Sequence, residues 1–341
     1  MEKSAKGEIV LSSPQGRKKI DKIDQRILTC LIQNSRMPLS RIGKIVKRSK
    51  VSVHQRVTRM IRDKVILDRI LLLNPLMWGS KLHLTLISLD PLHEEAGLKA
   101  LRGDERCIFL FRLSGRYNFL AGFCYATTES FHMGFGKLSR NLPMMGSTIL
   151  PVIKYDHVPY DLFGVSIPKE KERNSHQVEL TEIDAKILDE IRLEGDKRVS
   201  VVSRSTGGSY QQVRTRLTEL HKSGVIVRFF TNVDIFSLGF QCYLIFIELR
   251  RCDLWKQMFD YLVEHKKSSG VMAFDNSISL MAIMVIRDVQ ELRDIMSNIQ
   301  TRFPGSVKSY ENTLVFDQVW ADFFPKGVYE DVINKERRTY A

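Results

Sequence analysis

The chain has 341 residues, of which 43% are hydrophobic, so it is long enough for two or more packed domains. We find no apolar run of about 18 residues and no apolar leader, so we expect neither a membrane span nor a secretory signal. Five cysteines are scattered without a Cys-x-x-Cys pair, and the histidines show no ligand spacing. We therefore expect a cytoplasmic protein with no metal and no cofactor.

The positive charge is concentrated in one part of the chain. The formal charge is +13, and the whole excess lies in the first half. Residues 17–69 hold 16 basic and 4 acidic side chains, whereas residues 177–229 hold 9 and 8. A basic cluster confined to one small module is typical of a protein that binds a polyanion.

The same two stretches align without a gap at an offset of 160 residues. Ile23-Asp24 matches Ile183-Asp184, Arg56 matches Arg216, and Gly79 matches Gly239. Gapless identity over about seventy residues predicts one architecture that is used twice.

In chain order, apolar residues at helical spacing predict helices over residues 20–34, 39–48 and 50–64, the last one capped by Ser49. Val53, Val57, Met60 and Ile61 are expected on the buried face of the third helix. Two helices, a tight turn and a third helix are the helix-turn-helix order.

In the second copy, Thr181 with Asp184 predicts a capping box, and Gly224 predicts a helix end. The apolar runs 65–73 and 225–233 are expected to form a wing or small hairpin.

Each copy then continues as strand, helix, two strands, helix and strand, which is the ferredoxin-like order. The fold class is therefore α+β, with two tandem copies of a winged helix-turn-helix plus a ferredoxin-like βαββαβ domain. The expected parts are a flexible tail (1–16), the first reader (17–78), α/β domain one (79–160), a linker (161–177), the second reader (178–238), α/β domain two (239–326) and a C-terminal tail (327–341).

The third helix of the first reader has side chains that suit the major groove of DNA. Arginine pairs with guanine and glutamine with adenine, and the start of such a helix usually meets base edges. Cations on and beside the second helix suit phosphates, which give affinity without sequence information. The candidates for bases are Ser52, Gln55, Arg56 and Arg59. The candidates for phosphates are Arg41, Lys44, Lys47, Arg48, Lys50 and Arg62.

The second reader is less basic. Glu219 stands at the position of Arg59, and two glycines replace Lys47 and Arg48. We therefore expect it to be auxiliary, with the secondary candidates Gln211, Gln212, Arg214 and Arg216.

Several segments resemble the Lrp/AsnC family of leucine-responsive and feast/famine regulators. They are the opening Lys22-Ile23-Asp24-Gln25-Arg26-Ile27-Leu28, the segment Arg36-Met37-Pro38-Leu39-Ser40, the pair Val65-Ile66, and a loop, residues 113–120, similar to the family's Gly-x-x-Asp loop. The two copies cover residues 20 to about 325, and this double arrangement resembles tandem archaeal members, including the ending Phe323-Phe324-Pro325.

This resemblance implies a transcriptional regulator, not an enzyme, that binds double-stranded DNA. Its α/β domains would be RAM-type domains for assembly, either as a homo-oligomer or as an intramolecular pseudo-dimer. Members bind amino acids near the Gly-x-x-Asp loop, so Gly115 and Asn118 are candidates for an effector contact. Asn118 departs from the family because it replaces the acidic residue.

Two other functions fit parts of the pattern. The basic charge alone would suit an architectural protein that binds DNA without site specificity. Some proteins of this shape resemble sirohaem decarboxylases, which carry His and Arg after the wing. Here the corresponding loops, residues 74–76 and 234–236, contain no histidine.

Overall fold

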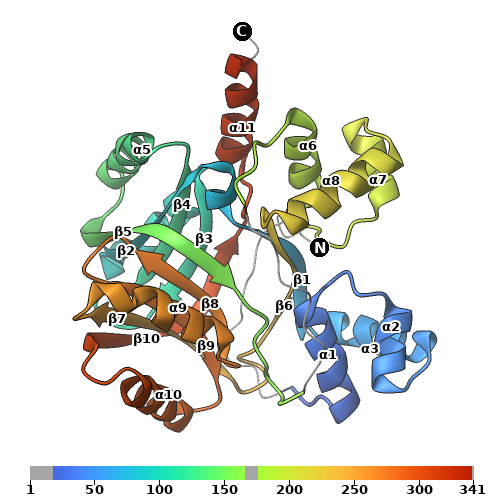
Figure 1. Ribbon diagram of the computed structural model, residues 1–341, viewed down its shortest axis with the longest axis horizontal. Coiled ribbons are helices and arrows are strands. Elements are labelled where there is room, and N and C mark those ends of the chain that lie inside the picture. The colour runs from blue at the N-terminus through green and yellow to red at the C-terminus, as the bar shows by residue number, and fades with distance from the viewer. Residues whose placement is uncertain (1–17, 166–175, 340–341) are drawn as a thin grey trace.

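The computed structural model describes residues 18–165 and 176–339, and it contains two tandem copies of one α+β unit (Figure 1). We call residues 17–160 copy one and residues 178–326 copy two. Copy one consists of α1 (Lys22–Gln33), α2 (Leu39–Val46), α3 (Lys50–Arg62), β1 (Ile66–Leu73), β2 (Lys81–Leu89), α4 (Glu94–Arg102), β3 (Cys107–Leu113), β4 (Phe119–Tyr125), α5 (Thr128–Arg140) and β5 (Met144–His157). Copy two consists of α6 (Glu182–Ile191), α7 (Val199–Thr206), α8 (Tyr210–Lys222), β6 (Ile226–Val233), β7 (Gln241–Leu249), α9 (Trp255–Glu264), β8 (Ser268–Phe274), β9 (Leu280–Ile286), α10 (Val289–Arg302) and β10 (Val307–Ala321).

The helix ends of both readers follow from local hydrogen bonds. The Ser49 hydroxyl accepts from the Ser52 backbone N–H at 3.2 Å, which caps α3 as predicted. Thr181 and Asp184 form the expected capping box on α6. Gly224 follows the end of α8 with a φ of +87°, a conformation that favours glycine.

The expected wing is not formed. The apolar runs after the two third helices are single strands, β1 and β6, and these strands pair antiparallel with each other across the two copies. Every residue of β6 is buried. An apolar run that is buried on both faces needs a partner strand and a cover, and the other copy supplies both. Figure 1 shows the pair between the two groups of reader helices.

The eight remaining strands form a closed barrel. Their order is β10-β3-β4-β2-β5-β8-β9-β7, so each copy supplies a four-stranded ferredoxin-like sheet. The sheets join edge to edge at two seams, β5 with β8 and β3 with β10. Closure leaves no free strand edge in the barrel. The helices α5, α9 and α10 lie outside it in Figure 1.

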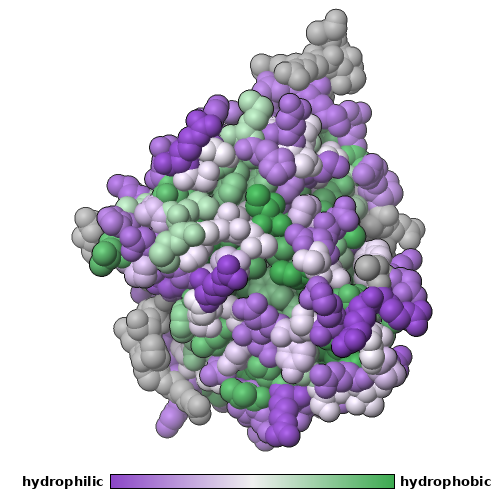
Figure 2. Space-filling model, turned by 90° about the vertical axis from the view of Figure 1, so that its left-hand side faces the viewer, coloured by the Kyte–Doolittle hydropathy of each residue, from purple (hydrophilic) through white to green (hydrophobic). Residues whose placement is uncertain are grey.

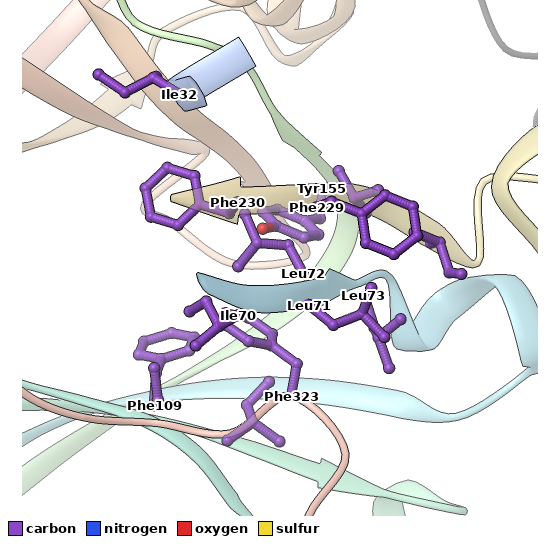
Figure 3. Packing of buried hydrophobic residues seen from close by; sticks show 14 of the residues in the cluster. Ile32, Ile70, Leu71, Leu72, Leu73, Phe109, Tyr155, Phe229, Phe230 and Phe323 are labelled. Carbon is purple, nitrogen blue, oxygen red and sulfur yellow. The ribbon is translucent and has the colours of Figure 1, made fainter. Parts of the chain in front are cut away.

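One continuous hydrophobic core links the barrel interior to the readers. Figure 3 shows side chains of β1 and β6 between Ile32 of α1 on one side and, on the other, Phe109 of the barrel and Phe323 from the segment after β10. Two smaller cores lie between the sheets and their outer helices. The readers are therefore fixed to the barrel by packing as well as by the chain.

The segment 327–341, which we expected to be a tail, is helical as far as residue 339, the last one that the structure describes. Helix α11 (Lys326–Thr339) packs on α6 of the second reader, and it buries Val328 and Val332. Its Asp331 pairs with Arg106 of copy one.

The side of the molecule seen in Figure 2 is mainly hydrophilic, with hydrophobic side chains between the polar ones. Within the described residues, no helix is long and apolar enough to span a membrane.

Candidate nucleic-acid interface

Helix α3 has one buried face and one exposed face. Val53, Val57 and Met60 are buried, as the helical spacing predicted. Ile61 was expected on the same face, but it is 44% exposed, because at the end of the helix it borders a cleft instead of the core. Gln55 and Arg59 are exposed, whereas Ser52 is half-buried.

The cations around the turn before α3 form an exposed cluster, which we call the basic turn. Among the described residues, none of its members pairs with a carboxylate. The Arg48 guanidinium donates to the Lys47 carbonyl at 2.9 Å. Lys47 itself has a φ of +55°, in the left-handed region that favours glycine. The members of the basic turn are Arg41, Lys44, Lys47, Arg48 and Lys50. Unpaired exposed cations beside a protruding helix suit contact with phosphates.

Two arginines of α3 are bound to α1 instead. Arg56 lies 2.8 Å from Oδ1 of Asp24 and 2.6 Å from Asp21, and Arg59 lies 2.5 Å from Oδ2 of Asp24. Asp24 is almost completely buried, whereas 45% of the Arg59 side chain is exposed. Hydrogen bonds to Asp21 and Asp24 raise the pKa of Arg56. Arg62 pairs with its exposed neighbour Asp63 at 3.0 Å.

The Arg56 contact recurs in the second reader. Arg216, which is 160 residues later, binds both oxygens of buried Asp184 at 2.7 and 2.6 Å. Hydrogen bonding to Asp184 raises the pKa of Arg216. The aspartate lies in the first turn of the first helix, and the arginine lies in the third helix. Because the pair is present in both readers whatever their charge, it holds the third helix against the first.

The second reader has the same shape but little exposed positive charge. Gln211, Gln212 and Arg214 are exposed on α8, and Glu219 pairs with Arg216 at 2.6 Å. The counterparts of the five cations of the basic turn are Val201, Arg204, Gly207, Gly208 and Tyr210. Only one of them is basic.

The predicted effector loop serves the fold of copy one. The Asn118 amide oxygen accepts from the Leu89 N–H at 2.8 Å, and its nitrogen donates to the Leu89 carbonyl at 3.1 Å and to Glu94 at 3.4 Å. Gly115 is exposed in the turn with a φ of +94°. Copy two uses Ser279 for the matching bond, which it accepts from the Leu249 N–H at 3.2 Å.

The described cysteines and potential metal ligands offer no further site. Of the cysteines, Cys30, Cys107, Cys124 and Cys242 are buried free thiols, and burial raises the pKa of each. No group of three or more potential metal ligands was found among the described residues.

Comparison with known proteins shows what the first reader is similar to. Residues 20–61 match the AsnC-type helix-turn-helix domain. This match spans the three helices of the first reader, which are therefore similar to an AsnC-type helix-turn-helix domain. The chain is 24% identical over 117 residues to an uncharacterized HTH-type transcriptional regulator of Haemophilus influenzae, covering 33% of this chain and 70% of the relative. It is 25% identical over 142 residues to another such regulator of Pyrococcus horikoshii, covering 42% and 89%.

A solved structure resembles this chain over nearly its whole length. The sirohaem decarboxylase NirDL matches with a TM-score of 0.59 and 12% identity, covering 94% of this chain and 99% of that one. At this identity the match shows the fold only. The tandem α+β architecture is therefore shared with a sirohaem decarboxylase.

Proposed function

We propose that this protein is a sequence-specific DNA-binding transcriptional regulator that binds DNA mainly through its first reader. The observation that carries the proposal is the basic turn, five exposed cations without a carboxylate partner beside an AsnC-type recognition helix. Both relatives are named transcriptional regulators. The nearly neutral second reader supports an auxiliary role for that module.

The side chains of the first reader divide into three roles. The basic turn and Arg62 contact phosphates. Gln55 and Arg59 read bases, with Ser52 near the start of the helix, because these positions lie on or beside the exposed stripe of α3. Arg56 braces α3 on Asp24 and so orients the readers of bases, which revises its place among the base-reading candidates.

The two α/β domains serve assembly. The closed barrel supports an intramolecular pseudo-dimer, since each copy supplies the partner sheet of the other. The Gly115–Asn118 loop offers an amino-acid effector few free polar groups, because Asn118 is engaged by Leu89 and Glu94.

The experiment is a selection of genomic fragments by the intact protein at about 0.15 M salt, followed by sequencing. The test variant is Lys47→Gly/Arg48→Gly, which gives the first reader the turn that the second already has. The matched control is Arg204→Gln/Arg214→Gln in the second reader. We expect a recurring motif that the test variant loses and the control retains. Equal losses in both variants would contradict the leading role of the first reader.

The same selection tests an architectural role. A protein that binds any DNA recovers fragments without a motif, and competitor DNA of random sequence displaces it as well as any recovered fragment does. A recurring motif with preferential binding would exclude that role.

A second candidate is a sirohaem decarboxylase, favoured by the fold match to NirDL. The two loops that follow β1 and β6 offer little for this chemistry. Asn74 is buried and accepts from the Leu76 N–H at 3.1 Å, and Asp234 is buried and accepts from the Ser237 N–H at 3.1 Å. Titration with an iron tetrapyrrole tests this candidate, and a Soret shift at stoichiometric protein would support it.

A further inference from the structure

The contact between the two copies has approximate two-fold symmetry. Ile70 of β1 lies opposite Phe230 of β6, its own counterpart at the offset of 160 residues. Reciprocal backbone bonds surround this pair. The Ser35 N–H donates to the Phe229 carbonyl at 2.8 Å, and the Gly195 N–H donates to the Arg69 carbonyl at 2.6 Å. Each copy therefore occupies the position that an identical partner would occupy in a symmetric dimer.

The side chains at these matched positions are not equivalent. On one side of the axis, the Arg36 guanidinium lies 4.0 Å from the centre of the Phe229 ring and donates to the Gly195 carbonyl at 2.5 Å. On the other side, Asp196 forms an ion pair with Arg69. Arg36 and Asp196 are counterparts, and so are Arg69 and Phe229.

Pairing of like copies would break both contacts. In a pair made of copy one and a second copy one, each Arg36 would lie beside the Arg69 of its partner, with no carboxylate between them. In a pair made of copy two and a second copy two, each Asp196 would lie against the Phe229 of its partner, with no cation nearby. Like charges at close range disfavour a complex, and such repulsive contacts are how interfaces reject wrong partners.

At a second place near the two-fold axis, the backbone bonds are again matched while the side chains differ. The Lys18 N–H donates to the Ser237 carbonyl, and the Val178 N–H donates to the Met77 carbonyl, both at 2.8 Å. The Lys18 ammonium lies 3.0 Å from the carboxylate of Asp234, whose side chain is only 5% exposed. In a pair of copies two, Val178 would replace Lys18 and leave this buried carboxylate without its cation.

The barrel seams repeat the asymmetry. Arg112 of β3 lies opposite Asp317 of β10, with 3.3 Å between their charged groups. At the other seam, Ala273, the counterpart of Arg112 in β8, lies opposite Lys154, the counterpart of Asp317 in β5. Lys154 and Asp260 also pair across the copies at 3.3 Å. Among the described ion pairs between copy one and copy two, only exposed Lys326–Glu105 places its cation in copy two.

We propose that copy one and copy two form a matched pair in which the cations of copy one select the carboxylates of copy two. The chain thus behaves as a covalently joined heterodimer that rejects pairing of like copies, within a chain or by exchange between chains. The charge difference between the halves thereby has a role in assembly that is separate from DNA binding. Each chain presents one charged reader, so a symmetric DNA site requires two whole chains.

The test uses the full chain with a protease site inserted within residues 166–175. The folded protein is cut there, incubated in mild denaturant so that the copies can exchange, returned to buffer and weighed by native mass spectrometry. We expect mixed pairs to make up at least about nine-tenths of all pairs, against about half for random pairing. Pairs of copy one at about a quarter of the total would overturn the proposal.

One substitution should reverse the preference. Arg69→Asp sets the introduced carboxylate against Asp196 in the mixed pair, but gives Arg36 a partner in a pair of copies one. We expect such pairs to rise about tenfold. Arg69→Ala removes the ion pair without offering a new partner, and Arg69→Asp/Asp196→Arg restores opposite charges. If Arg69→Asp yields no more pairs of copy one than Arg69→Ala does, the charges do not select the partner.

Discussion

Arg56 of α3 lies 2.8 Å from Asp24 of α1, and this ion pair recurs in copy two as Arg216 and Asp184. The two pairs differ in their surroundings, because Asp24 also binds Arg59, whereas Glu219 replaces that arginine in the second reader. Without Arg56, the buried carboxylate of Asp24 therefore keeps Arg59 as a partner. Without Arg216, the buried carboxylate of Asp184 has no cation.

This difference predicts unequal effects on stability. Arg216→Ala should lower the free energy of unfolding by about 3 kcal/mol and Arg56→Ala by about 1 kcal/mol, since a buried charge without its partner is costly. Urea titration followed by circular dichroism measures both. Arg216→Ala should leave DNA affinity nearly unchanged when the protein is folded. Equal destabilisation by the two variants would contradict the compensating role of Arg59.

The basic turn predicts a change in the salt dependence of DNA binding. Lys47→Gly/Arg48→Gly removes two phosphate contacts, so the slope of log affinity against log salt should fall in magnitude by about 2. The variant should also fold at least as well, because glycine accepts the positive φ of residue 47. Fluorescence anisotropy at several salt concentrations measures the slope. The reverse change, Gly207→Lys/Gly208→Arg, should steepen it, and an unchanged slope in both would place the contacts elsewhere.

The Asn118 bridge predicts that the family's acidic residue is harmful here. Asn118→Asp places a carboxylate beside the Leu89 carbonyl and Glu94, so the variant should lose about 2 kcal/mol of stability at neutral pH. The deficit should shrink as the pH falls toward 4, because the protonated carboxyl donates to the carbonyl again. Thermal unfolding at several pH values measures it. Ser279→Ala, the control in copy two, loses one bond without a charge and should show no such pH dependence.

His83 predicts acid sensitivity of copy one. It stacks on Phe131 with 3.9 Å between ring centres, and burial lowers its pKa from 6.5 to about 4. The unfolded chain therefore binds a proton that the folded chain excludes, so stability is full above pH 6.5 and falls as the pH drops toward 4. This loss amounts to about 3 kcal/mol. His83→Leu should remove that part of the acid dependence, whereas His54→Gln on the exposed side of α3 should retain it. Parallel pH curves for His83→Leu and the unmodified protein would refute this role.

Sequence patterns were enough to predict the repeat, the three helices of each reader, the caps of α3 and α6, and the concentration of charge in the first reader. These features depend on contacts within a few residues, such as Ser49 with Ser52, or on counting charges. The ferredoxin-like order of strands and helices also followed from local patterns, because the strand and helix periods differ.

The contacts between distant segments follow only from the three-dimensional fold. An apolar run such as residues 226–233 is equally consistent with a wing and with a buried strand, and its partner β1 lies in the other copy. The same holds for Arg56, because an arginine on a helix can face solvent or a carboxylate 32 residues away. Closure of the barrel and the docking of α11 likewise depend on long-range packing. Charge pattern and periodicity determine which face of a segment can be buried. The pairing of the two copies determines which other segment covers that face.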